Sequence, residues 1–372
     1  RIAIGRAAVS AANFSAQIGE ATNSGANATL KFRSQIIANE AWIDAATGFA
    51  RIDGTGNLVK IAGTPLTGTL TADNTGVGTG ALAAVTTGVD NSAYGVNALN
   101  ALTSGNDNTA FGDNAMPVAT TANNNVAVGS AAGLALTTAA GNTLIGTNAG
   151  LAVTTSANNV ALGLNALSSA VTNGSNTAIG TSALSTVNSA VVGEGIENTA
   201  VGVSALSGLT TGSYNTSVGQ SAGSSLTTAT NNIAVGRNTQ AGTTASNNTI
   251  VGTTAGSAAL GANNTALGVN TLNSAAVAVT DLVAIGANAL TDAVTTNGTV
   301  AVGSSALTAL TTGATNTAVG STAGSTITTG SSNTVIGHTT SAGATVSNNT
   351  IIGATAGATT LGGNNTAVGV NT

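Results

Sequence analysis

The chain has 372 residues, of which 5% are charged and 2% are aromatic, and it contains 50 glycines and no cysteine. Six of its seven basic residues lie in the first 60 positions, and the rest of the chain contains only one more, Arg237. This composition excludes disulfides and thiolate metal sites. Beyond residue 60, the chain lacks the clustered Lys and Arg through which proteins bind nucleic acid or an anionic membrane.

The segment 1–73 differs from the rest of the chain in composition and pattern. It holds four of the seven aromatic residues, and it begins with two glycine-terminated pieces, 1–5 and 16–19, that resemble a shorter coil of the same design as the later repeats. Between Lys31 and Leu70, alternating segments such as 48–52 and 57–61 are separated by Gly-rich turns and predict strands. We therefore predict a β-rich collar with two short coils over 1–73, and a repeat array over 74–372.

In the array a glycine recurs at every seventeenth position, give or take one, and the spacing is interrupted by a single longer, irregular step over 181–201. A fixed period of this length predicts a solenoid, in which each coil buries its apolar residues only against its neighbours. We call these positions the register glycines, and they are Gly78, Gly95, Gly112, Gly129, Gly146, Gly163, Gly180, Gly202, Gly219, Gly236, Gly252, Gly268, Gly286, Gly303, Gly320, Gly337, Gly353 and Gly369.

The residues before each register glycine predict one short strand. Three residues before it the side chain is β-branched in every coil except that of Ser92, and the residue just before it is apolar in all eighteen coils. The residue between is usually Ala, so the pattern has the period of two that a strand requires. We predict that the column just before the glycine is core. Tyr94 and Phe111 belong to this column, as do Val128, Ile145, Val201, Val235, Val319 and Ile336.

Two further columns complete the repeat. Four residues before the glycine lies Asn in sixteen of eighteen coils, interrupted by Leu282 and Thr299, and we expect these amides to hydrogen-bond their own turn and the next coil. Three residues after the glycine lies Ala or Thr, followed mostly by Leu or Gly. Members of the Asn column include Asn108, Asn142, Asn176, Asn215 and Asn316.

These columns predict the fold class. Two short strands and two turns per coil give an all-β parallel solenoid of about 18 coils, with a length of roughly 85 Å at the spacing of paired strands. The segment 201–271 aligns with 302–372 without a gap, and 43 of the 71 pairs are identical, which indicates block duplication. Because the earlier block continues past the equivalent of Thr372, we expect the natural polypeptide to continue as well.

The unit Asn-Thr-Ala-Val-Gly-x-x-Ala-Leu resembles the long repeats of bacteriophage tail fibre proteins. It is also similar to the head repeats of YadA-like trimeric autotransporter adhesins, although those have a shorter period and more charge. The resemblance covers 74–372 and, weakly, 1–19. It implies a left-handed parallel β-roll of three identical chains and a role in attachment to a cell surface. The longer period and the scarcity of charge favour the fibre.

Few residues are candidates for chemistry. His338 is the only histidine, so a metal or catalytic role is not expected. Arg237 and His338 occupy equivalent places just after a register glycine, either as ligand contacts or, the interpretation we favour, as one ancestral exposed position. Glu194 and Glu197 in the irregular step are better interpreted as surface charges than as a calcium or glycosidase pair. Tyr214 is expected to be exposed in a bend and is the best candidate for stacking on a sugar.

We therefore expect a structural protein with no enzymatic activity, no cofactor and no metal. The favoured function is the shaft of a tail fibre or similar appendage of a virion, self-associated as a homotrimer and carrying a tip that binds a host receptor or glycan. An Ala-rich flank would allow close approach of the three chains. The alternatives are an extracellular filament or adhesin on a bacterial surface and, less favoured, a fibre-borne polysaccharide depolymerase. No nucleic acid or membrane partner is expected for this segment.

Overall fold

The computed structural model describes residues 41–45, 48–52, 74–170, 174–188, 191, 193–256, 260–274, 278–292, 294–357 and 362–371. The strand predicted at 48–52 is confirmed as β2 (Gly48–Ile52), which pairs antiparallel with β1 (Ala41–Ala45). The strand predicted at 57–61 and the short coils predicted within 1–19 lie outside the described residues.

Each coil of the array contributes one short strand that ends just before its register glycine. The strands are β3 (Thr75–Val77), β4 (Ser92–Tyr94), β5 (Thr109–Phe111), β6 (Val126–Val128), β7 (Thr143–Ile145), β8 (Val160–Leu162), β9 (Thr177–Ile179), β10 (Thr199–Val201), β11 (Thr216–Val218), β12 (Ile233–Val235), β13 (Thr249–Val251), β14 (Thr265–Leu267), β15 (Val283–Ile285), β16 (Val300–Val302), β17 (Thr317–Val319), β18 (Thr334–Ile336), β19 (Thr350–Ile352) and β20 (Thr366–Val368).

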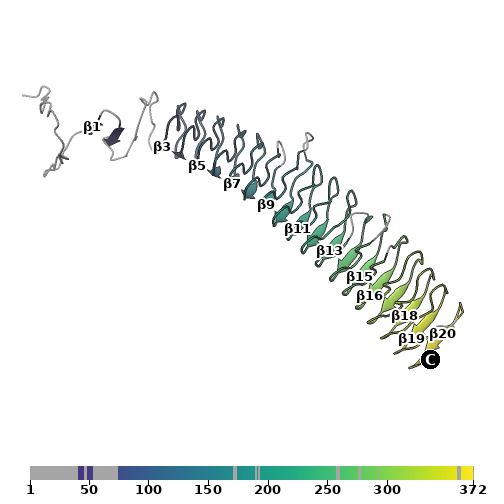
Figure 1. The fold of residues 1–372 in the computed structure, drawn as a ribbon. Coiled ribbons are helices and arrows are strands. Elements are labelled where there is room, and N and C mark those ends of the chain that lie inside the picture. The colour runs from purple at the N-terminus through teal and green to yellow at the C-terminus, as the bar shows by residue number, and fades with distance from the viewer. Residues whose placement is uncertain are drawn as a thin grey trace, which may run out of the picture.

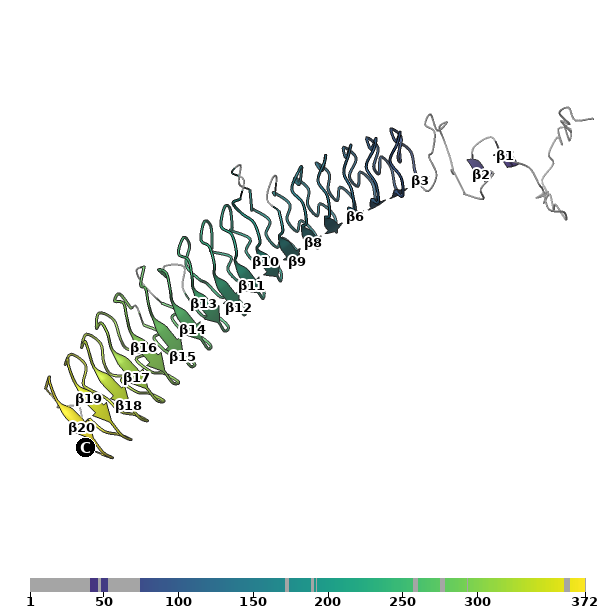
Figure 2. The same cartoon turned by 180° about the vertical axis from the view of Figure 1, so that it is seen from behind.

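The eighteen strands form one parallel sheet in which like residues pair with like along the axis. Thr75 pairs with Ser92 and Val77 with Tyr94, and the same register continues to the pairing of β19 with β20. The strands follow one side of an elongated, gently curved rod, and the bends of the coils follow the other side (Figure 1, Figure 2). The predicted parallel β-solenoid is therefore confirmed, and neighbouring coils are equivalent in structure as well as in sequence.

The prediction of two strands per coil is wrong, because the described residues of each coil contain one strand. The Ala-Leu segment after the glycine forms turns, and its Leu residues have left-handed backbone, as at Leu99 and Leu167 with φ of 49° and 52°. This segment still bonds to the next coil, since the amide of Leu99 donates to the carbonyl of Ala115 over 3.1 Å. Stacking therefore satisfies backbone groups in a segment that is not extended.

The interior of the coil is filled by the middle residue of each strand, and our assignment of the column just before the glycine to the core is wrong. Ala127 and Leu144 are fully buried, whereas Val128 and Ile145 beside them are only half-buried. Successive residues of a strand point to opposite sides, so only one of the two columns can face inward. Val201 and Val235 are likewise half-buried, and Val319 and Ile336 are each 37% exposed.

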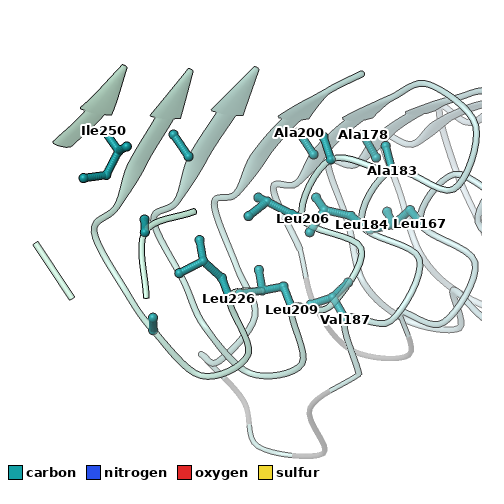
Figure 3. Close-up of a cluster of buried hydrophobic side chains, with 14 of the residues drawn as sticks. Leu167, Ala178, Ala183, Leu184, Val187, Ala200, Leu206, Leu209, Leu226 and Ile250 are labelled. Atoms are coloured by element: carbon teal, nitrogen blue, oxygen red, sulfur yellow. The ribbon is translucent and has the colours of Figure 1, made fainter. Parts of the chain in front are cut away.

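Leu and Ala from the turns pack against these middle residues from across the coil. Figure 3 shows Ala178 and Ala200 from the strands facing Leu184 and Leu206 from the turns, with Leu209 further along the bend. All five are fully buried. The core is thus narrow, because each strand contributes a single, mostly small residue to it. This explains how an Ala-rich chain with few aromatic residues fills the core.

The Asn column is buried and forms the hydrogen-bonded row that we predicted. Nδ2 of Asn142 donates to Oδ1 of Asn125 over 3.1 Å, and Oδ1 of Asn142 accepts from the backbone amide of Asn159 over 3.0 Å. Nδ2 of Asn125 also donates to the carbonyl of Asn123 in its own turn. Each such amide therefore ties its bend to the neighbouring coils and removes the cost of burying polar groups.

The irregular step does not interrupt the stack. β9 and β10 pair in the usual register across it, and Nδ2 of Asn198 donates to Oδ1 of Asn176 over 3.2 Å. The extra residues of this step are therefore accommodated in the bend. The row of Asn side chains is interrupted where Leu282 and Thr299 replace Asn. Both residues are buried, and the Oγ1 atom of Thr299 has no hydrogen-bond partner.

Candidate functional site

The column just before the register glycines forms a continuous apolar strip on the outer face of the sheet. We use the name apolar strip for these eighteen residues, none of which is buried. Phe111 is 57% exposed and Tyr94 38% exposed, and their rings lie 5.7 Å apart between centroids. Exposed apolar area that continues over a whole rod marks an interaction surface more often than isolated exposed residues do.

The neighbouring column on the same face of the sheet is polar. Two residues before each member of the strip, the side chain is Thr in twelve coils. Because this Thr shares its side of the strand with the strip, its hydroxyl was the sequence signal that this face is the outer one. The complete strip consists of Val77, Tyr94, Phe111, Val128, Ile145, Leu162, Ile179, Val201, Val218, Val235, Val251, Leu267, Ile285, Val302, Val319, Ile336, Ile352 and Val368.

The predicted Ala-rich outer flank is not present among the described residues of the array. The middle-column Ala of the strands, such as Ala93 and Ala110, are fully buried, and so are Ala98 and Ala115 after the glycine. Small side chains therefore serve the narrow interior of each coil, and the surface available for close approach between chains is the apolar strip.

The structure brings Tyr214 next to Glu197, two residues that the sequence analysis considered separately. They occupy equivalent places in adjacent coils, since the amide of Tyr214 donates to the carbonyl of Ile196 over 3.1 Å. Both have left-handed backbone, with φ of 54° for Glu197 and 61° for Tyr214, and both are exposed. Tyr214 is 50% exposed, so the prediction of an exposed tyrosine in a bend is confirmed.

Arg237 and His338 are exposed and structurally equivalent, as the sequence predicted. The carbonyl of Arg237 accepts the amide of Thr254, the carbonyl of His338 accepts that of Thr355, and both distances are 2.9 Å. Six coils separate the two residues, which is roughly 30 Å at the spacing of paired strands. One small ligand cannot contact both.

The described residues do not gather the groups that metal or membrane sites use. They contain no group of three or more His, Cys, Asp or Glu that could hold a metal ion. No helix in the described part of the chain is long and apolar enough to cross a membrane. The described array accordingly offers a long apolar strip and, in one bend, an exposed Tyr214 in the coil next to that of Glu197.

Comparison with known proteins gives no relative for this chain. No family model matches it, and searches of curated proteins and of solved structures also find no match.

Proposed function

We propose that residues 74–372 form the shaft of a tail fibre or similar appendage, which supports attachment to a host cell surface as part of a virion. The observation that carries this proposal is the uninterrupted parallel sheet from β3 to β20. Every coil is tied to the next through backbone bonds over the full length, including the irregular step. Such a rod resists bending and holds its two ends at a fixed separation.

The proposed role is mechanical and not enzymatic. The interior is filled mainly by Ala and Leu, and most of the Asn column is hydrogen-bonded within it. Glu194 and Glu197 belong to the bend of the irregular step, and the one aromatic residue in the equivalent bend of the next coil is Tyr214. A polysaccharide depolymerase requires paired acids in a cleft lined by several aromatic residues. This argues for a shaft that bears a receptor-binding part elsewhere in the assembly.

We further propose that the shaft is a homotrimer. In a single chain the apolar strip is exposed to water, and association of three chains would bury it. Multi-angle light scattering of the purified chain should give about 105 kDa, three times 35.0 kDa. Electron microscopy of the same sample should show unbranched rods. A particle of 35.0 kDa would contradict the trimer, and a compact globule would contradict the shaft itself.

One observation favours the alternative of a surface adhesin whose array touches the host directly. Tyr214 and Glu197, both exposed, occupy equivalent places in adjacent coils at the irregular step. Binding of the fluorescently labelled chain to bacterial or host cells would separate the two functions. If Tyr214→Ala abolishes binding and the exposed Thr87→Ala does not, the array itself is the adhesive part.

A further inference from the structure

We propose that copies of this chain associate side by side through the apolar strip, with their axes parallel and like coils at the same level. This inference rests on the proposed shaft function for the parallel direction, and on the structure for the face. The strip is the continuous exposed apolar feature of the described array, and it follows the sheet for its whole length.

The strip and the Thr column beside it contain no charged side chain. Charged residues such as Asp113 and Arg237 lie just after the register glycine, at the margin of this face. An interface core without charges avoids the cost of burying unpaired ions, and polar residues at its rim are typical of stable interfaces. Two copies can therefore meet on this face without like charges at the centre of the contact.

The area of the strip is sufficient for a stable contact. A standard interface buries about 800 Å² on each partner. Nine of the eighteen strip side chains are 37% to 66% exposed and the other nine are partly exposed, and together they supply an area of this order. Tyr94 and Phe111 are the bulkiest members, and aromatic residues of this kind contribute most strongly to interfaces.

A second copy of this chain fits the strip better than a globular partner does. The strip extends for roughly 85 Å at the spacing of paired strands, and a compact domain would cover only several coils of it. Another copy presents an uncharged apolar strip of the same length and the same rise per coil. A shaft with a base at one end and a tip at the other also requires all copies to run in one direction, which selects the parallel arrangement.

Cysteine cross-linking tests this arrangement cleanly, because the chain contains no cysteine. We would prepare Val128→Cys in the fourth coil, Val319→Cys in the fifteenth, and Thr87→Cys on an exposed bend as the control. A disulfide requires the two Cβ atoms to approach within about 4.5 Å. In the proposed arrangement Val128→Cys and Val319→Cys each form covalent pairs on mild oxidation, and Thr87→Cys does not.

An antiparallel contact would overturn the proposal and gives a different result. Full antiparallel overlap of eighteen coils places the fourth coil opposite the fifteenth, so cross-links would form only in a mixture of Val128→Cys and Val319→Cys chains. Absence of cross-links in every variant would equally overturn it.

A charge in the strip provides a second measurement that does not depend on oxidation. Val128 is only half-buried in its own coil, so Val128→Asp should keep the circular dichroism spectrum of the solenoid and lower the mass to that of one chain. Thr87→Asp should leave the mass unchanged. If the parent is trimeric and Val128→Asp remains trimeric, the strip is not the interface and the shaft proposal still stands. If the parent itself is monomeric, both the homotrimer and the association through the strip are contradicted.

Discussion

Leu144 and Gly150 face each other inside one coil, and a Cβ atom built on Gly150 would lie 2.7 Å from Cδ2 of Leu144. The next coil has the opposite arrangement, with the small Ala161 on the strand and the large Leu167 in the turn, both fully buried. The two positions therefore share one volume. The same exchange accounts for Gly256 and Gly357, which face Ile250 and Ile351 of their own strands. It does not account for Gly133, Gly223 and Gly324, whose strands carry a small middle residue.

We predict that exchanging large and small residues at this pair restores stability. Leu144→Ala should cost about 2–5 kcal/mol through the cavity that it leaves, and Gly150→Leu alone should clash with Leu144. The double variant should recover most of the loss. A leucine can adopt the left-handed backbone of Gly150, because Leu167 does so at the equivalent position of the next coil, with φ of 52°. Thermal unfolding of the four proteins measures this. A double variant less stable than both single variants would show that the two positions do not share one volume.

The register glycines are expected to reject any side chain. Gly163 has φ of +137°, and a Cβ atom there would lie 2.7 Å from the backbone of Gly180 in the next coil. Both the backbone conformation and the clash oppose Gly163→Ala, which should cost at least about 2 kcal/mol. Gly362 has no atom within 4 Å of such a Cβ, so Gly362→Ala serves as the control and should change stability little. Hydrogen exchange of the coils around each site would report the difference, and equal protection in both variants would contradict this account.

Restoring the Asn column at its interruption should stabilise the rod. Thr299 is buried with an unsatisfied Oγ1, and it offers no amide oxygen to Asn316 in the next coil. Thr299→Asn should let the amide of Asn316 donate to the new Oδ1, as that of Asn159 does to Asn142. We expect a gain of about 1 kcal/mol, seen as slower hydrogen exchange over 282–316. Faster exchange there would show that the interruption is required by local packing.

The hydroxyl of Ser217 should be dispensable. It replaces the usual Ala in the middle of β11, is fully buried, and its Oγ has no hydrogen-bond partner. Ser217→Ala should raise stability by about 1 kcal/mol, because an unpaired buried polar group is removed without loss of packing. Denaturant unfolding would measure the change. The neighbouring Thr216→Ala, on the outer face of the same strand, is the control and is expected to give no gain.

Much of the fold could be predicted from particular columns of residues. The register glycines predicted the coil boundaries, and the β-branched residues such as Thr109 and Val126 placed a strand in the right position in every coil. The hydrogen bonding of Asn142 to the next coil was also predicted correctly, and the structure adds that its side chain is buried. Local conformation repeats with the sequence in a solenoid, so these features are set within one unit and its neighbour.

The direction that each strand faces could not be predicted in the same way. Val128 is larger and more apolar than Ala127, so residue type alone favoured Val128 for the core, and the structure buries Ala127 instead. The turn segment already supplies Leu and Met to the interior, as at Leu99 and Met116, so little depth remains on the strand side. The candidate site changed accordingly, from dispersed residues such as Tyr214 to a continuous outer strip.

The sequence by itself determined the period, the strand class, the column of hydrogen-bonded amides and the need for glycine, because each of these depends on the conformation of a unit that is repeated eighteen times. Only the tertiary structure decided which side of each strand is interior. That choice depends on how the bend closes around a narrow space. A strand this short has an alternating pattern whichever way it faces, so the packing of the opposite segment makes the choice.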